Sequence, residues 1–331
     1  MNNPVPLAEL WRGDILESTH FGHAVICDGA GQIVQAWGDP DAIIYPRSSA
    51  KMIQALPLIE SGAADAVGLG TEQLALACAS HQGEHQHTDR VAAWLDAIGM
   101  GESDLRCGVQ VPNDPAVRQE LRETNACACQ LHNNCSGKHT GFLTLNRHLG
   151  GHSEYVEADH PVQLACRDAF EGVTGMESPG YGIDGCSAPN FATSVHGLAR
   201  AMGSFASAHT RSDTRSRAQA RLTDAMIAHP NLIAGTGRAC TELMGAMKGR
   251  AAIKTGAEAV FVAILPEQQL GIALKVIDGG TRGSECAIAA LLVKLGLLEA
   301  DHPAVLNRMN KVQKNWRGLE TGILRPAADL L

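Results

Sequence analysis

Two short apolar runs near the start of the chain predict its first secondary structure. Residues 24–27 and 33–37 are rich in Val, Ile and Trp, and residues 28–31, with the sequence Asp-Gly-Ala-Gly, separate them. Apolar runs on either side of a glycine-containing turn are typical of a β-hairpin. We therefore predict two paired strands between Thr19 and Gly38.

The same pattern returns toward the other end of the chain. Residues 252–257, 259–265 and 270–277 are apolar runs, and a Pro-Glu-Gln-Gln turn at residues 266–269 precedes the last of them. These runs predict the strands of a second hairpin. Residues 281–298 follow with the length and spacing of a helix.

Between the two hairpins the apolar spacing is mainly helical. Ser48 or Ser49 can cap a helix that runs to about Ser61, because Pro46 stands just before them and Gly62 just after. Further helices are predicted at residues 71–78, 88–98, 115–125, 140–149, 160–172, 191–202 and 213–229.

Three polar loops interrupt the helical middle, at residues 79–87, 132–139 and 181–190. The second loop leads directly into an apolar helix. A loop at a helix N-terminus is suited to hold an anion or a metal ion, because backbone N–H groups are unpaired there. We take these loops as the places to look for chemistry.

Strands at both ends and helices in the middle predict an α/β fold of the α+β type. One antiparallel sheet would be built from both chain ends, with helices and an inserted, mainly helical region. Residues 1–45 and 235–331 would together form the sheet-containing domain, and residues 46–234 the helical domain with the polar loops. A substrate cleft is expected between the two domains.

Composition and charge narrow the class of function. The chain has 331 residues, 45% hydrophobic and 19% charged, with a formal net charge of −8. An acidic chain without a long basic run is not expected to bind nucleic acid, so a small-molecule substrate fits better. No run of 18 apolar residues is present. The first twenty residues carry Glu9, Arg12, Asp14 and Glu17, which is not the basic end and apolar run of a signal peptide. We expect a soluble, cytoplasmic protein.

Ten cysteines in 331 residues are too few for a disulfide scaffold. Most lie inside apolar runs, where free thiols behave as small hydrophobic groups. Cys127, Cys129, Cys135 and Cys186 lie in polar surroundings instead. The Cys-x-Cys spacing of the first two is short for a zinc knuckle, and a structural role is the favoured interpretation for them.

The candidate chemistry begins at Ser48 and Lys51. Three residues apart at a helix start, the two side chains share one face, and a desolvated amine can take the proton of a serine hydroxyl. Residues 254–256, Lys-Thr-Gly, lie on the first strand of the second hairpin. A Ser-x-x-Lys helix facing a Lys-Thr-Gly strand matches the organisation of serine β-lactamases, penicillin-binding proteins and serine glutaminases. A Ser-Asp-Asn motif is missing, and Ser80 is the best candidate for the middle hydroxyl.

Five motifs along the chain resemble the bacterial L-asparaginase family related to the inducible, thermolabile enzyme of rhizobia. This family is distinct from the threonine-dependent and the N-terminal-nucleophile asparaginases. The resemblance implies hydrolysis of the asparagine side-chain amide, a β-lactamase-like fold, a homodimer and a zinc site beside the nucleophile. The motifs are Tyr-Pro-Arg-Ser-Ser-Ala-Lys at 45–51, Ala-Ser-His at 79–81, Asn-Asn-Cys-Ser-Gly-Lys-His at 133–139, Asp-Gly-Cys-Ser-Ala-Pro at 184–189 and Lys-Thr-Gly at 254–256.

The resemblance also implies roles for individual residues. Ser48 resembles the nucleophile with Lys51 as its amine, and Ser80 with Lys254 resembles a second Ser-Lys pair. The remaining positions resemble zinc ligands at Cys135, Lys138 and Cys186, and substrate or supporting groups at Arg47, His139 and Asp184.

The chemistry of these residue types agrees with the implied roles. A lysine acts as a base only when burial or a nearby cation lowers its pKa. Zinc held by two cysteines and one lysine keeps a fourth position open, and the lysine must lose its proton to bind. The alternative is a set of reactive, metal-free thiols. Arg47 can hold an α-carboxylate and Asp184 an α-ammonium group, unless both only form ion pairs or caps. Of the histidines near the polar loops, His139 alone is kept as a site residue.

Several alternatives stay open at this stage. A glutaminase, or another amidase that acts on β-lactams or peptides, would use the same residues. A protein of another class would bind zinc or an amino acid with the same fold and would not convert a substrate. The spacing to Lys51 favours Ser48 over Ser49 as the nucleophile. Which lysine is the base, and whether an acyl-enzyme forms, are not decided.

Overall fold

The computed structural model describes residues 3–331, which divide into two compact units. The sheet unit contains the described residues up to Ser49 together with Thr193–Ser207 and Glu242–Leu331. The helical unit contains Ala50–Ala192 and Ala208–Thr241. Each unit is described by itself.

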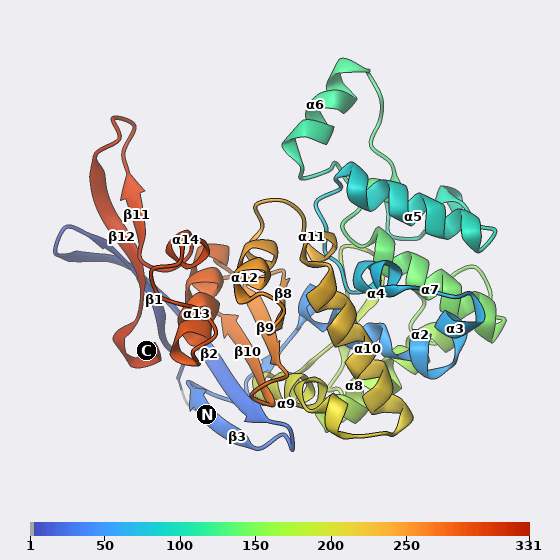
Figure 1. Ribbon diagram of the computed structural model, residues 1–331, viewed down its shortest axis with the longest axis horizontal. Helices are drawn as coiled ribbons and strands as arrows, with labels where there is room; N and C mark the ends of the chain where they lie inside the picture. Colours follow the sequence, from blue (N-terminus) through green and yellow to red (C-terminus); the bar gives the residue numbers. More distant parts are fainter. Residues whose placement is uncertain (1–2) are drawn as a thin grey trace. The chain divides into compact units, whose positions relative to one another are not determined.

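An eight-stranded antiparallel sheet forms the sheet unit within residues 3–331 (Figure 1). The strand order is β11-β12-β1-β2-β10-β9-β8, and β3 also pairs with β2. Two short strands, β4 and β7, pair separately. The bounds are β1 Val5–Arg12, β2 Ile15–Asp28, β3 Ile33–Trp37, β4 Ile43–Ile44, β7 Thr193–Ser194, β8 Ala252–Gly256, β9 Val260–Leu265, β10 Leu270–Val276, β11 Lys311–Lys314 and β12 Glu320–Pro326.

Strands from the two chain ends pair at two places, β1 with β12 and β2 with β10. These strands are antiparallel, with Val25 opposite Ala273 and Ile26 opposite Ile272. The hairpin predicted near the N-terminus is β2–β3, and its turn is held by two backbone N–H groups that donate to Asp28 Oδ1. The predicted antiparallel sheet from both chain ends is therefore confirmed.

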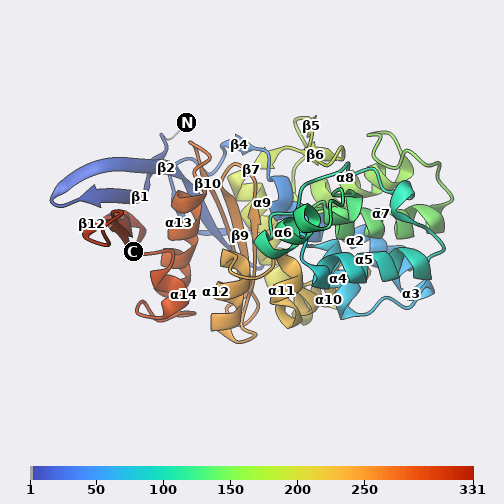
Figure 2. The ribbon, with the colours of Figure 1, turned by 90° about the horizontal axis from the view of Figure 1, so that it is seen from above.

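Helices cover both faces of this sheet, which is why β9 is buried along its whole length. In Figure 2, α9 and α13 lie on opposite sides of β9 and β10. β10 and α9 approach closely at two glycines, since a Cβ on Gly271 would lie 2.0 Å from the backbone nitrogen of Gly203. The helices of this unit are α9 Val195–Ala206, α13 Thr281–Lys294, α14 Pro303–Leu306, η5 Ala328–Leu330 and most of α12 Ala239–Met247.

The close packing of α9 corrects the expected domain bounds. Residues 46–234 were expected to form one helical domain, but the segment 193–207 belongs with the sheet. The apolar face of α9, including Leu198 and Met202, is fully buried in the sheet unit. The strand β10 that α9 packs against lies far from α9 in sequence, so local spacing does not reveal this contact.

Replacing Gly271 by alanine is expected to destabilise the protein by about 3 kcal/mol, because the new methyl group would meet the backbone of α9 rather than a flexible side chain. Gly245 in α12 is the control, since a Cβ there meets nothing within 4 Å. Gly245→Ala should stabilise by about 0.5–1 kcal/mol through helix propensity. Urea unfolding measures both changes, and equal effects would contradict the packing argument.

The helical unit is a set of helices packed around α4, α7 and α10, with a small hairpin, β5–β6. None of the helices in residues 3–331 is both long and apolar enough to cross a membrane. The bounds are α1 Lys51–Gln54, α2 Leu56–Glu60, α3 Ala63–Ala66, α4 Thr71–Ala77, α5 His85–Ala97, η2 Glu102–Asp104, α6 Pro115–Glu123, η3 Gln130–His132, α7 Ser136–Leu149, α8 Pro161–Thr174, β5 Tyr181–Ile183, β6 Pro189–Phe191, η4 Ala208–Thr210, α10 Thr214–Ala228 and α11 Pro230–Ile233.

Two predicted helices are corrected. The helix expected from residue 48 to Ser61 is broken into η1 Arg47–Ala50, α1 and α2, and α1 is separated from α2 because Pro57 lacks the N–H group that a continuous helix needs. The helix expected from residue 191 begins only at Val195, where Ser194 caps it by accepting from Gly197 N.

Strands β1, β11 and β12 were not assigned, since each has exposed or half-exposed positions and little apolar alternation.

Candidate active site and metal site

The structure distributes the candidate residues over both units. The sheet unit carries three of them and the helical unit seven. Arg47, Ser48 and Lys254 belong to the sheet unit, and Lys51, Ser80, Cys135, Lys138, His139, Asp184 and Cys186 to the helical unit.

The nucleophile turn, defined here as residues 46–49, distinguishes its two serines. Ser49 is fully buried, and its hydroxyl donates to Pro46 O at 2.7 Å. Ser48 is half-buried, and in the described residues 3–331 no hydrogen bond holds its hydroxyl. The local structure therefore leaves Ser48, not Ser49, with a hydroxyl that is available for chemistry.

Arg47 stands in a strained backbone conformation beside this serine. Its φ angle is 53°, in the left-handed region that residues with a Cβ rarely adopt. Such strain costs on the order of 1 kcal/mol and collects at functional sites, where the surrounding structure holds it in place. The turn at Ser48 is thus a fixed feature rather than a regular helix start.

The Lys-Thr-Gly strand packs directly against the nucleophile turn. A Cβ on Gly256 would lie 2.6 Å from Pro46 O and 3.1 Å from Ser49 N, so glycine is required at this contact. Lys254 stands two residues earlier on β8, on the same face of the strand as Gly256. Its side chain is 1% exposed, and Nζ donates to Thr255 O at 2.8 Å. The sheet unit thereby brings the Lys254 strand and the Ser48 turn together.

Lys51 is the first residue of α1 and is also buried. Its Nζ donates to Ala79 O at 2.5 Å and to Asn134 O at 3.3 Å. Ala79 precedes Ser80, and Asn134 precedes Cys135. Within the described chain Lys51 forms no ion pair with a carboxylate. The Lys51 amine is therefore hydrogen-bonded to two of the polar loops, and no carboxylate of the described chain pairs with it.

His81 holds the Ser80 loop in place. Ser80 N donates to Ile233 O at 2.8 Å, and Gly83 N donates to His81 Nδ1 at 3.2 Å. Since Nδ1 accepts, the proton of His81 is on Nε2, which lies 3.0 Å from Ser136 Oγ. His81 is therefore a link between this loop and the start of α7.

Asn133 shapes the loop that leads into α7. Its amide nitrogen donates to Cys107 O and Gly108 O, both at 2.9 Å, and its Oδ1 accepts from Cys135 N at 2.9 Å. These three bonds fix the backbone just before Lys138 and His139. Asn133 is the first residue of the motif at 133–139, and the sequence indicated no role for it.

Cys186 reaches the same place from the loop between β5 and β6. Asp184 N donates to Ala188 O, Ser187 N donates to Asp184 O, and Ser187 has a φ of 69°. This tight loop leaves Cys186 buried and places its Sγ 3.0 Å from Lys138 Nζ. The structure thus confirms that Lys138 and Cys186, 48 residues apart, lie together.

The two thiols and the amine form a charged, buried cluster. A hydrogen bond from Cys135 lowers the pKa of Cys186 against the effect of burial, and the Lys138 ammonium lowers it further. The same hydrogen bond, with burial, raises the pKa of Cys135. Burial works against the Lys138 ammonium, but the charges of Cys186 and Cys135 outweigh it and raise its pKa. These shifts favour the thiolate form of Cys186, which lies against the Lys138 ammonium group.

Tyr155 determines which nitrogen of His139 carries the proton. Arg106 N donates to Tyr155 Oη at 2.8 Å, so the hydroxyl proton is directed to His139 Nδ1, 2.9 Å away. Burial lowers the pKa of His139 to about 4, against the raising effect of Cys186, so the ring is neutral at pH 7. His139 therefore carries its proton on Nε2.

The Nε2 atom of His139 is buried and makes no hydrogen bond of normal geometry within residues 3–331. Cys186 is its protein neighbour, since a contact between the His139 ring and the Cys186 thiol raises the pKa of His139 and lowers that of Cys186. Such an atom suits an acceptor on a bound molecule. Tyr155 was missed by the sequence analysis, since nothing in its loop distinguishes it.

A zinc ion fits this cluster by donor chemistry. Cys135 and Cys186 would supply two sulfurs, and Lys138 would supply a nitrogen once it had lost its proton. In the part of the chain that the structure describes, no three His, Cys, Asp or Glu side chains could hold a metal ion, so a site here depends on the lysine. His139 is not a ligand in this arrangement because its Nε2 carries the proton.

The remaining polar-loop residues have ordinary structural partners. His85 pairs with Glu120 at 2.7 Å, and His87 Nε2 lies 3.0 Å from Asn231 O. Cys129 Sγ lies 3.3 Å from His132 Nδ1, which also accepts from Cys129 N. The contacts of Cys129 agree with the structural role expected for the Cys-x-Cys segment. His85 and His87 were expected to be solvated loop residues, but both lie on α5 and His87 is fully buried.

Comparison with known proteins places the chain in context. Its sequence matches the family model of L-asparaginase II over residues 8–326. A search of curated proteins found no match. The structure is similar to that of Mglu in its native form, with a TM-score of 0.50 and 12% identity over 89% of this chain and 69% of that chain. A β-lactamase from Mycobacterium bovis gives a TM-score of 0.47 at 13% identity, over 82% of this chain and 94% of that chain. The similarity to Mglu shows a shared fold.

Proposed function

The chain belongs to the L-asparaginase II family, and from this premise we propose that it hydrolyses the side-chain amide of L-asparagine to L-aspartate and ammonia by a Ser-Lys mechanism. The family makes the protein an amidohydrolase that acts on a small molecule. The observation that carries the finer proposal is the nucleophile turn. There Ser48 keeps an available hydroxyl beside a strained arginine, while the hydroxyl of Ser49 is buried and bonded.

In the proposed reaction Ser48 Oγ attacks the side-chain amide carbon of asparagine. Lys51 takes the hydroxyl proton, and the amide nitrogen leaves as ammonia after it has been protonated. Water then cleaves the resulting ester and releases aspartate, so one water is consumed for each ammonia. The absence of a carboxylate partner for Lys51 in the described chain supports this role, because such a partner would hold the lysine in its charged form.

Ser80 and Lys254 are proposed as a second Ser-Lys pair that passes protons during acylation and deacylation. Lys254 is almost fully buried on a strand that contacts the nucleophile turn. Ser80 stands on the loop whose Ala79 carbonyl accepts from Lys51. Both amines are buried.

Arg47, Asp184 and His139 are proposed to bind the substrate. Arg47 offers a guanidinium fork for the α-carboxylate, and Asp184 can accept the α-ammonium group. The Nε2–H of His139 has no protein acceptor of normal geometry in residues 3–331 and can donate to a substrate oxygen. These three groups match the handles of a free amino acid.

Zinc is proposed as a ligand of Cys135, Lys138 and Cys186. When bound, it would add a Lewis-acidic centre whose fourth position is open to water or substrate. The proximity of Lys138 Nζ and Cys186 Sγ supports this set of ligands. The alternative is a metal-free group of reactive thiols.

Replacing either Cys135 or Cys186 by serine is expected to weaken zinc binding at least about a hundredfold, because a hydroxyl is a poor replacement for a thiolate ligand. Competition against a chromogenic chelator measures the affinity without reference to turnover. Cys127→Ser is the matched control, since Cys127 is exposed and outside the cluster. Equal affinity in all three variants would rule out this site.

Ammonia release tests the proposed activity. The purified protein should release ammonia from L-asparagine faster than from L-glutamine, and should not open a chromogenic β-lactam. Preference for glutamine would indicate a glutaminase, and β-lactam cleavage another amidase with this fold. Binding of an amino acid without ammonia from any amide would identify a non-catalytic binding protein and overturn the proposal.

A homodimer is proposed on the family resemblance. Large apolar side chains are exposed at two hairpin ends of the sheet unit, with Ile15 at 74% and Trp316 at 107% exposure, and burial of such side chains by a second copy would support assembly. Light scattering after size exclusion should give twice the chain mass, and the monomer mass would contradict this. Location in the cytoplasm stays a prediction.

A further inference from the structure

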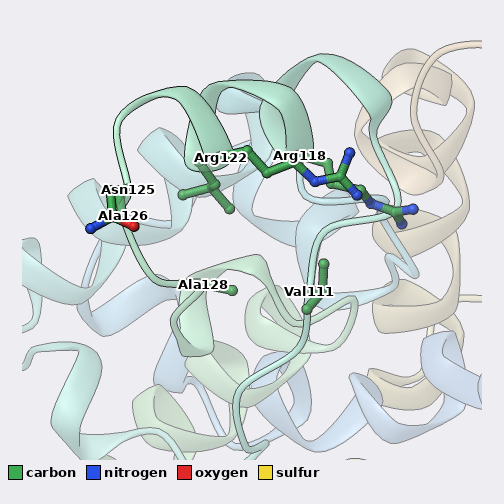
Figure 3. Close-up of a pocket in the computed structure, with 7 residues that line it drawn as sticks. Val111, Arg118, Arg122, Asn125, Ala126 and Ala128 are labelled. Carbon is green, nitrogen blue, oxygen red and sulfur yellow. The ribbon is translucent and has the colours of Figure 1, made fainter.

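A pocket lies under an arch built from residues 109–128. Its volume is about 600 Å³, within the usual range of roughly 300–1,000 Å³ for small-molecule sites. The helix α6 forms the top of the arch, and Val111 and Ala128 lie on its two sides (Figure 3). None of the candidate catalytic, substrate or zinc residues lines this pocket.

Two arginines give the pocket its charge. Arg118 and Arg122 are one helical turn apart on α6, and Figure 3 shows both side chains extending toward the same side of the arch. In the described residues 3–331 neither guanidinium pairs with a carboxylate. Arg118 donates only to the backbone oxygen of Pro112, at 3.1 and 2.9 Å. The chain as a whole has a net charge of −8. Two neighbouring guanidinium groups that have no carboxylate partner in the described residues therefore stand out, and their positive charge favours an anionic ligand.

The rest of the lining is largely apolar. Val111 is 57% exposed, although valine is usually buried. Leu121 and Ala126 join it in the pocket, and no Asp or Glu side chain lines the pocket within the described chain. A ligand with an apolar body would cover these side chains. An ammonium group on the ligand would lose its hydration in the pocket, and no carboxylate among the lining residues would replace it.

The arch is held open by its own hydrogen bonds. Asp114 caps α6 by accepting from Val117 N at 2.8 Å, and its backbone N–H donates to Gln82 O at 2.9 Å. At the other end Asn125 adopts a left-handed φ of 52°, and Ala126 N donates to Leu121 O. Both ends of the helix are therefore fixed. A preformed pocket lowers the entropy cost of binding.

We propose that the pocket under α6 binds a small organic monocarboxylate, with Arg118 and Arg122 holding the carboxylate and Val111 and Leu121 contacting the apolar body. This inference is independent of the proposed hydrolysis. The carboxylate can accept from both guanidinium groups at once, and the lack of an acidic lining residue selects against amino acids and amines.

Calorimetric titration with hexanoate at constant ionic strength tests the proposal. Hexanoate should bind saturably, and the double variant Arg118→Gln/Arg122→Gln should bind it at least about tenfold more weakly. Leu121→Ser should also weaken binding. The double variant Lys314→Gln/Arg317→Gln, which also removes two positive charges and changes only exposed positions, is the matched control and should bind as the parent does.

Two further ligands make the test specific. Hexylamine has the same apolar chain and the opposite charge, and L-aspartate has carboxylates and an ammonium group. Neither should compete with hexanoate, and hexanoate should still bind to Ser48→Ala. Lack of saturable binding, equal affinity in the double variant, or loss of binding in Ser48→Ala would each overturn the proposal, and the last would assign the ligand to the active site.

Discussion

Replacing Ser48 by alanine is expected to lower kcat for ammonia release by about 10⁴-fold or more, because the reaction loses its nucleophile and keeps only binding and electrostatic stabilisation. The half-buried side chain makes no hydrogen bond in residues 3–331, so the variant should fold with parent stability. Steady-state kinetics together with urea unfolding separates the two effects.

Ser49→Ala is the matched control for this prediction. Its hydroxyl donates to Pro46 O inside the nucleophile turn, so its loss should cost about 1 kcal/mol of stability. The kcat of the folded variant should stay within a few-fold of the parent. If Ser49→Ala is inactive and Ser48→Ala is active, the nucleophile is the wrong serine and the interpretation of the turn fails.

Replacing Lys51 by methionine is expected to lower kcat at least about a thousandfold, since the amine that takes the serine proton is gone. Methionine keeps most of the buried volume, so packing should survive. Two backbone acceptors, Ala79 O and Asn134 O, would lose their donor, and the loss of stability should be about 2–4 kcal/mol. The rate must therefore be compared for equal amounts of folded protein.

Lys51→Arg gives the sharper test of the lysine's role. Arginine keeps a positive charge and hydrogen-bond donors but does not release its proton in proteins. If Lys51 is the base, the arginine variant should be as inactive as the methionine variant. Recovery of the parent rate would show that Lys51 acts only through its charge or its hydrogen bonds. Lys294→Met, at an exposed position at the end of α13, controls for the loss of a lysine in general.

The sequence specified the central strands of the sheet and most of the helices, but not strands β1, β11 and β12. The turn at Asp28 and the apolar runs of β9 and β10 are local signals, and the predicted hairpins were confirmed. The long helix expected after Ser48 was wrong because Pro57 breaks it. The segment 193–207 was assigned to the wrong unit, since its contact with Gly271 joins residues that are far apart along the chain.

The candidate site was named mainly through motifs, and the structure adds the reasons. The spacing to Lys51 favoured Ser48 over Ser49, and the bond from Ser49 to Pro46 adds a structural reason for that choice. Lys138 and Cys186 were paired only through a family resemblance, and the structure places their side-chain atoms 3.0 Å apart. The roles of these residues stay proposals for experiment.

The sequence by itself determined the composition, the strands at both ends, the helical middle and the residue types at each motif, because these follow from local spacing and turn chemistry. Only the tertiary structure decided which serine keeps an available hydroxyl, which histidine nitrogen carries a proton, and that two unpaired arginines share a pocket. Those properties depend on hydrogen bonds and burial between distant residues, such as Arg106, Tyr155 and His139. Burial and hydrogen bonding set the chemistry of a side chain, and neither can be read from its neighbours in sequence.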